Sequence, residues 1–288
     1  MDVVKHKRAI TEVFDRAAAE FDGSGVAFFG PIGRRVVELA GVRPGDAVLD
    51  IGCGRGAILF PAAGAAGPGG SVLGVDVAQG MVDAVRAEAD RSGLAHVTAV
   101  VMDGERLRLG ALRFDAILAG FSIMHMPSAP GVLGSYLRLL QPGGVLCFSD
   151  LVDEDGLPPF VPRPVFELLR PYFPAGPDPR ERGRDSWSHR VEDIERALGG
   201  LGFDRVHVHE ETFDMVLESG EQWIAWSMST GLRAAWDNVP AADAAPLRAS
   251  VAAGVERLRD AAGGLRLRVP VRYVTGRRPL DRDRERAA

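Results

Sequence analysis

The sequence predicts an α/β protein with a doubly wound parallel sheet and helical insertions. Between residues 41 and 150, short apolar runs that end in acidic or small residues alternate with segments of helical periodicity. A glycine-rich turn, residues 52–56, directly follows the first of these runs. The chain has 288 residues, which is more than a single domain of ~150 residues needs, so the surplus length is expected in insertions.

The elements follow from apolar spacing along the chain. Apolar residues at three- and four-residue steps predict helices, and short apolar runs bounded by turn residues predict strands. Helices are expected at 4–21, 31–39, 79–92, 130–140, 165–172 and 189–201, and strands at 47–52, 71–77, 96–103, 113–121, 144–150, 203–213 and 266–275.

The regular alternation stops after Asp150, where prolines and arginines become frequent, and it resumes near residue 189. A second helical stretch with three tryptophans separates the last two strands. The resulting division is N-terminal helices that cover the binding site at 1–40, a core at 41–150, a lid at 151–188, core again at 189–217, a helical cap at 218–262, the last core strand at 263–276 and a disordered tail at 277–288.

Composition excludes several classes of protein. Hydrophobic residues make up 46% and charged residues 25%, which argues against disorder, and a net charge of −5 argues against nucleic-acid binding. Two distant cysteines predict neither a disulfide framework nor a metal site. No apolar stretch reaches the length of an export signal or a membrane span. We therefore expect a cytoplasmic protein without a bound metal.

Acidic residues at the ends of three strands identify the kind of ligand. Gly52, Gly54 and Ala57 also fit the dinucleotide fingerprint, so an oxidoreductase that uses NAD or FAD is one alternative. However, Asp50 points a carboxylate at the loop where a dinucleotide would place its pyrophosphate. Asp76 lies where a carboxylate accepts from ribose hydroxyls. Together with Asp103 after the third strand, these residues predict a small cationic nucleoside with an amino-acid tail.

The motifs DIGCGRG, VLGVDVAQGMV, MDGERL, FDAILAGFSIMHM and LQPGGVL occur in this order. In them the sequence resembles the class I S-adenosylmethionine-dependent methyltransferases, over about residues 36–150. The resemblance implies a Rossmann-like seven-stranded sheet whose last strand is antiparallel. It also implies S-adenosyl-L-methionine as cofactor, with Gly52, Cys53 and Gly54 at the methionine moiety, Asp50 supporting that end, Asp76 at the ribose, Val77 and Met81 on the adenine, Asp103 and Gly104 at its amino edge, and the Ala119 carbonyl at the amine.

The segment SIMHMPSAP half-matches the His-His-x-Pro stretch of ubiquinone/menaquinone-type and other small-molecule methyltransferases, because the first histidine is Met124 here. His125 is the candidate general base, and the alternative is a hydrogen-bonded histidine at the start of a helix. The predicted acceptor pocket comprises Phe21, Phe29, Met124, Trp187, His189, Trp223 and Trp226.

The predicted activity is O- or C-methylation of a largely apolar small molecule, a bacterial secondary metabolite, by in-line displacement. The protein is expected to be a monomer or homodimer without nucleic-acid or membrane partners. A protein that binds S-adenosylmethionine without transferring its methyl group stays open as an alternative, because the motifs indicate binding. The acceptor is not identified by the sequence.

Overall fold

A computed structural model describes residues 3–127, 129–152, 157–173, 187–188 and 190–280. Internal contacts divide the chain into two compact units. Unit 1 consists of Met1–Phe28, Leu151–Ser186 and Glu211–Val271, and unit 2 consists of Phe29–Asp150, Trp187–Glu210 and Arg272–Ala288.

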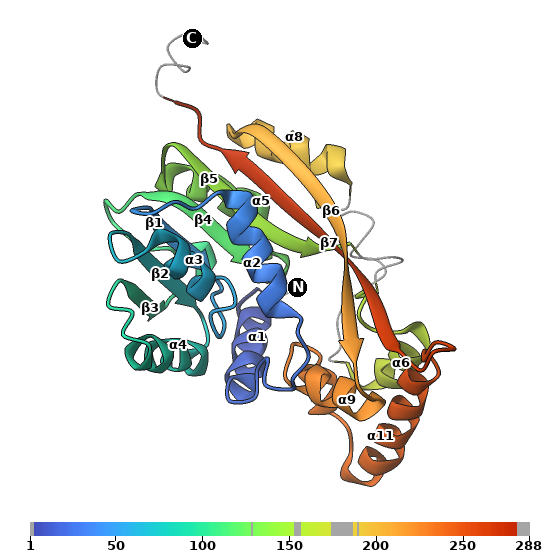
Figure 1. Cartoon of the computed structure of the whole chain (residues 1–288). Coiled ribbons are helices and arrows are strands. Elements are labelled where there is room, and N and C mark those ends of the chain that lie inside the picture. The colour runs from blue at the N-terminus through green and yellow to red at the C-terminus, as the bar shows by residue number, and fades with distance from the viewer. Residues whose placement is uncertain (1–2, 128, 153–156, 174–186, 189, 281–288) are drawn as a thin grey trace. The chain divides into compact units, whose positions relative to one another are not determined.

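Within the described residues, seven strands form one sheet in the order β3-β2-β1-β4-β5-β7-β6 (Figure 1). The pairs β1–β2, β2–β3, β1–β4 and β4–β5 are parallel, whereas β7 is antiparallel to β5 and to β6. The predicted fold, including the antiparallel last strand, is confirmed. The strands are β1 (Ala47–Ile51), β2 (Ser71–Asp76), β3 (Val97–Val101), β4 (Phe114–Gly120), β5 (Leu140–Leu151), β6 (Asp204–Leu217) and β7 (Leu265–Arg277).

The order of the strands reverses on either side of β1, which pairs with β2 on one edge and with β4 on the other. In register, Asp50 on β1 faces Gly74 on β2 and Leu118 on β4. Open α/β sheets bind ligands beyond the carboxyl ends of the strands at such a reversal. The loops after β1, β2 and β4 therefore outline the candidate site.

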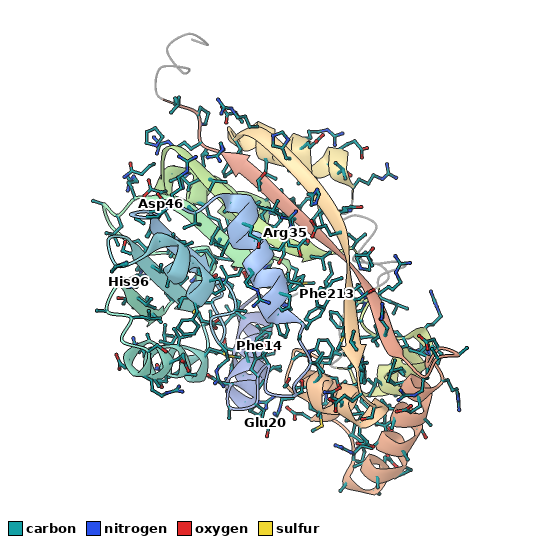
Figure 2. All side chains as sticks on the ribbon, in the orientation of Figure 1. Phe14, Glu20, Arg35, Asp46, His96 and Phe213 are labelled. Carbon is teal, nitrogen blue, oxygen red and sulfur yellow. The ribbon has the colours of Figure 1, made fainter. Side chains whose placement is uncertain are left out.

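Helices and the sheet bury the core of unit 2. Leu133 on α5, Leu198 on α8 and Phe148 on β5 belong to one apolar cluster. At the start of β1, the Asp46 side chain (Figure 2) accepts a hydrogen bond from the backbone N–H of Arg43 at 2.8 Å, which fixes the turn that leads into the strand. The helices and 3₁₀ turns of unit 2 are α2 (Phe29–Ala40), α3 (Leu59–Ala66), α4 (Gln79–Arg91), η1 (Gly104–Arg106), η2 (Ile123–His125), α5 (Ala129–Leu139) and α8 (Val191–Leu201).

Unit 1 has its own core, built around aromatic rings from all three of its segments. The ring centroid of Phe28 lies 5.3 Å from Trp226, 5.8 Å from Phe160 and 5.8 Å from Phe213, each pair edge to face. These contacts join the segments into one compact body. Its helices are α1 (Val3–Ala17), α6 (Arg163–Leu169), η3 (Arg170–Tyr172), α9 (Gly220–Met228), α10 (Arg233–Trp236) and α11 (Ala241–Glu256).

Two departures from the sequence-based elements concern helix α3 and the residues after 276. Helix α3 was not predicted, because its run LFPAAGAA lacks a polar face and gives no helical periodicity. The boundary expected for the disordered tail, residue 277, lies too early in the sequence. Arg277 donates to the Gly143 carbonyl and Arg278 to the Leu140 carbonyl, and both residues are ordered parts of unit 2.

Candidate functional site

The glycine-rich loop after β1 folds over the end of β2. The backbone N–H groups of Gly52 and Cys53 both donate to the Val75 carbonyl, at 2.7 and 3.0 Å. Gly52 and Gly54 have φ angles of 69° and 50°, a region that residues with a Cβ rarely adopt. The loop therefore takes a conformation that favours glycine at positions 52 and 54.

Asp76 at the end of β2 holds this loop in place. One carboxylate oxygen accepts a hydrogen bond from Gly54 N–H and the other from Ala78 N–H, both at 2.9 Å. The side chain thus fixes the glycine loop and the start of α4 with one carboxylate oxygen each.

Asp50 is the most unusual side chain of the site. It is 1% exposed, and neither carboxylate oxygen has a hydrogen-bond partner among the described residues. Burial, and next the charge of Asp76, raise the pKa of Asp50 from 3.8 to about 8. The Leu59 backbone N–H has a smaller, opposite effect on this pKa, although its position does not meet the geometry of a hydrogen bond. A buried carboxylate without a partner favours a cationic ligand group.

Four other residues predicted to bind the cofactor, Cys53, Val77, Met81 and Ala119, carry no charge. Burial, followed by the charges of Asp50 and Asp76, raises the pKa of the Cys53 thiol, so the thiol stays protonated and unreactive. Met81 on α4 is buried and Val77 is partly buried just after β2. Ala119 is buried on β4.

Asp103 and Gly104 form the loop after β3, as the sequence predicted. An Asp103 carboxylate oxygen accepts a hydrogen bond from Glu105 N–H at 2.9 Å and begins the turn η1. The Gly104 carbonyl accepts a hydrogen bond from the Tyr136 hydroxyl on α5, also at 2.9 Å. The loop is thus fixed from two sides.

The turn after β4 carries Met124 and His125. Phe121 leaves the strand with a φ of 51°, and its ring lies edge to face with that of Phe29, at 6.3 Å between centroids. Met124 is 46% exposed, and His125 is half-buried at the end of η2. On β5, Phe148 contacts Trp187 at 6.1 Å between ring centroids.

The remaining predicted pocket residues belong to unit 1 or lie outside the described residues. Trp223 and Trp226 are fully buried in the core of unit 1, and the Trp223 indole N–H donates to the Phe160 carbonyl at 3.0 Å. Phe21 is half-buried and lies edge to face with Phe14. His189 lies outside the described residues. The acceptor role of all seven predicted pocket residues stays a prediction.

The residues of unit 2 fit S-adenosylmethionine. The unpartnered Asp50 carboxylate suits the ammonium group of its methionine end, and Asp76 presents a carboxylate at the end of β2, where ribose hydroxyls would donate to it. The glycine loop with its positive φ angles begins two residues after Asp50 and is bonded to Asp76 through Gly54 N–H. A cationic nucleoside with an amino-acid tail satisfies all three features.

Comparison with known proteins identifies the family. Residues 48–144 match the family model described as "Methyltransferase domain". The nocamycin O-methyltransferase of Saccharothrix syringae is 38% identical over 278 residues, which cover 92% of this chain and 97% of that protein. The chain is a class I S-adenosylmethionine-dependent methyltransferase.

Other comparisons agree with this methyltransferase assignment. The aklanonic acid methyltransferase of Streptomyces sp. (strain C5) is 39% identical over 208 residues, which cover 70% of this chain and 94% of that protein. The phosphoethanolamine N-methyltransferase 2 of Haemonchus contortus, solved with S-adenosyl-L-methionine, shares the fold at a TM-score of 0.54 and 17% identity. That match covers 86% of this chain and 52% of the other. The cofactor is S-adenosylmethionine.

The NAD- or FAD-dependent oxidoreductase is thereby set aside. Asp50 agrees with this, since a buried acidic side chain at the glycine loop offers a pyrophosphate no positive charge to bind. Sequence reasoning missed three residues that shape the methyltransferase site, Phe121, Ser122 and Tyr136. The backbone strain at Phe121 and the contacts of Ser122 and Tyr136 arise from tertiary packing, for which the sequence carries no local signal. Among the described residues, no helix combines the length and apolar character needed to cross a membrane.

Proposed function

We propose that this methyltransferase transfers the methyl group of S-adenosylmethionine to an oxygen atom of a largely apolar small molecule of bacterial secondary metabolism. The match to the nocamycin O-methyltransferase carries the proposal. The match covers 92% of the chain, so the unmatched part is shorter than any of the three segments of unit 1. Each of these segments therefore lies at least partly within the match. The similarity thus extends beyond the cofactor-binding motifs to the segments predicted to form the acceptor pocket.

Each cofactor contact in the proposal has a physical basis. Bound S-adenosylmethionine supplies an electrophilic methyl group on a sulfonium centre. Asp50 binds the ammonium group, Asp76 accepts from the ribose hydroxyls, and Val77 and Met81 pack on the adenine, whose amino edge faces Asp103. This binding holds the methyl group in one orientation, and positioning can supply ~7–11 kcal/mol of a barrier.

His125 is the proposed general base. It ends the 3₁₀ turn that follows β4, at the carboxyl edge of the sheet. If the acceptor is a hydroxyl or carboxylic acid, the imidazole removes its proton as the methyl group is transferred. Such a base contributes about 10²–10⁴-fold to a rate.

The test combines label transfer with binding. The protein is incubated with methyl-labelled S-adenosylmethionine and, as probes, aklanonic acid and a set of apolar phenols and carboxylic acids. We expect label in an ether or ester of at least one probe. Asp76→Ala is expected to weaken S-adenosylhomocysteine binding by about 100-fold or more, because two charge-assisted hydrogen bonds of ~1.5–3 kcal/mol each are lost. The exposed Asp83→Asn on α4 is the control.

His125→Ala should lower kcat by at least 100-fold and remove the acidic limb of the pH profile, while His207→Ala, exposed on β6, changes neither. A rate within threefold of the wild type overturns the role of His125 as a base. Tight S-adenosylhomocysteine binding without labelled product from the probes or from a metabolite extract would instead favour a protein that binds the cofactor without methyl transfer.

The acceptor class also agrees with the charge of the chain. A net charge of −5 gives no attraction for a polyanion, so we propose a small molecule in preference to RNA or DNA. The cytoplasmic location and the monomeric or homodimeric state stay predictions. Size-exclusion chromatography with light scattering determines the oligomeric state.

A further inference from the structure

The segment of residues 122–126, here called the bridge segment, contacts both cofactor loops of unit 2. At its first residue, the Ser122 hydroxyl donates a hydrogen bond to the Ile51 carbonyl at 2.6 Å. A Cβ atom placed on Gly52 would lie only 2.4 Å from the Cβ of Ser122. Ser122 is therefore packed directly against the glycine loop and hydrogen-bonded to Ile51, the residue before that loop.

The last residue of the bridge segment reaches the other cofactor loop. A Cβ atom placed on Gly104 would lie 2.7 Å from the methyl carbon of Met126 and 3.5 Å from the Tyr136 hydroxyl oxygen. Tyr136 donates to the Gly104 carbonyl and also lies 3.5 Å from the Met126 sulfur. The loop predicted to bind adenine and the end of the bridge segment thus share one packed contact.

Between these two ends the chain has little freedom. His125 N–H donates to the Ser122 carbonyl at 3.1 Å, and Met126 N–H donates to the Ile123 carbonyl at 2.9 Å. The Ile123 side chain is buried beneath this turn. A displacement of either cofactor loop is therefore transmitted to His125 through hydrogen bonds and close packing.

The turn also begins with an unfavourable backbone conformation. Phe121 has a φ of 51°, which a residue with a Cβ keeps only where its surroundings enforce it. Its N–H donates to the Ser149 carbonyl at 3.2 Å, and its ring packs on Phe29. These contacts set the direction in which the chain reaches Ser122.

We propose that Ser122 is a positioning residue that couples occupation of the cofactor loops to the placement of His125. This inference rests on the proposed function, in which His125 faces the acceptor. A bound cofactor restricts the motion of the loops at Gly52 and Gly104 further, and with it the motion of the bridge segment that is packed against both. His125 is thereby held more firmly in its working position when the methyl donor is bound.

Hydrogen exchange measured with S-adenosylhomocysteine tests the coupling without an acceptor. In the wild type, the ligand should slow exchange of the His125 and Met126 amides by at least tenfold. In Ser122→Ala the ligand should still protect the loops at 52–54 and 103–105, while its effect on the two bridge amides falls below threefold. Ser135→Ala is the control, because the Ser135 hydroxyl donates to the Val132 carbonyl within its own helix. Its pattern should match the wild type.

Two results overturn the inference: wild-type bridge amides that do not respond to the ligand, or a Ser122→Ala protein in which they respond as in the wild type. General destabilisation is recognised separately, because it would speed exchange in β1 and β2 as well. A low-stability variant is then measured at a lower temperature, where these strands are protected.

Activity provides a second readout. For an acceptor that the wild type methylates, Ser122→Ala should lower kcat at least tenfold while S-adenosylhomocysteine affinity stays within threefold. Rates are normalised to the number of binding sites found by calorimetry, which removes the contribution of unfolded protein. Unchanged kcat overturns the positioning role. A wild type that methylates nothing contradicts the proposed function, and in that case the exchange experiment still decides the coupling.

Discussion

Replacing Asp50 with asparagine should make the ligand-free protein more stable relative to the wild type as the pH rises. The folded protein raises the pKa of Asp50 from 3.8 to about 8, first through burial and next through the charge of Asp76. An acid with a raised pKa in the folded state contributes stability that is complete below its unfolded pKa and is lost as the pH rises through the folded value. The wild type should therefore lose stability between about pH 4 and pH 8.

The magnitude follows from the same linkage. Each pH unit inside this window changes the free energy of unfolding by about 1.4 kcal/mol, so the change from pH 5 to pH 8 is roughly 4 kcal/mol. Asparagine has no charge to bury. Its amide hydrogens lack partners there and cost about 1–3 kcal/mol, but this cost is independent of pH. The pH dependence of the difference between the two proteins therefore isolates the carboxylate.

Urea unfolding of wild type, Asp50→Asn and the exposed Asp90→Asn at pH 5 and pH 8 measures this difference. The advantage of Asp50→Asn over the wild type should grow by several kcal/mol between the two pH values, while Asp90→Asn follows the wild type. Growth of less than about 1 kcal/mol would refute the reasoning, because Asp50 would then ionise alike in the folded and unfolded chains.

Cofactor binding should depend on pH for the same reason, but it should strengthen as the pH rises. An ammonium group binds the carboxylate form, so binding near pH 7 releases a proton from Asp50. Affinity for S-adenosylhomocysteine should then rise by up to tenfold per pH unit from pH 6 to pH 8. Calorimetry in buffers of different ionisation enthalpy counts the released proton. Asp50→Asn should bind weakly at every pH and release none from this site.

Two further substitutions test the packing. Gly52→Ala should destabilise the protein more than Gly41→Ala. Both residues have φ near 70°, but only a Cβ at position 52 meets a side chain, that of Ser122, at 2.4 Å. Overpacking of this kind costs about 1–3 kcal/mol, and equal unfolding free energies of the two variants would contradict the close contact. Trp223→Phe should lower the unfolding free energy by about 2–4 kcal/mol, because the buried hydrogen bond to the Phe160 carbonyl and some packed volume are lost. A change in the KM for the acceptor without loss of stability would instead favour the predicted role of Trp223 in the pocket.

The cofactor loops could be predicted from the sequence because their signals are local. Asp50 and Asp76 each end or nearly end a short apolar strand, and the glycines of the first loop follow at a fixed distance. A parallel sheet brings the carboxyl ends of its strands together, so these side chains meet whatever the loops between them contain. The structure places them at neighbouring strand ends and links Asp76 to Gly54.

The surroundings of His125 could not be predicted in the same way. The residue types of the motif do not indicate that Phe121 has a positive φ or that Ser122 packs on Gly52. Both features depend on how β4 and β5 approach β1. The tryptophans of α9 show the converse limit, since helical spacing identifies an inward face but does not distinguish a core from a ligand pocket.

Unit 1 is assembled from three separate stretches of chain, and two of its boundaries, at residues 210/211 and 271/272, fall inside the continuous strands β6 and β7. A chimaera with a relative cannot exchange this unit as a single cassette. Crossovers placed in β6 and β7 would have to preserve the alternation of inward and outward side chains, because a shift of one residue reverses every side chain of the strand. Recombination libraries between this enzyme and its relatives should therefore conserve strand register at both positions.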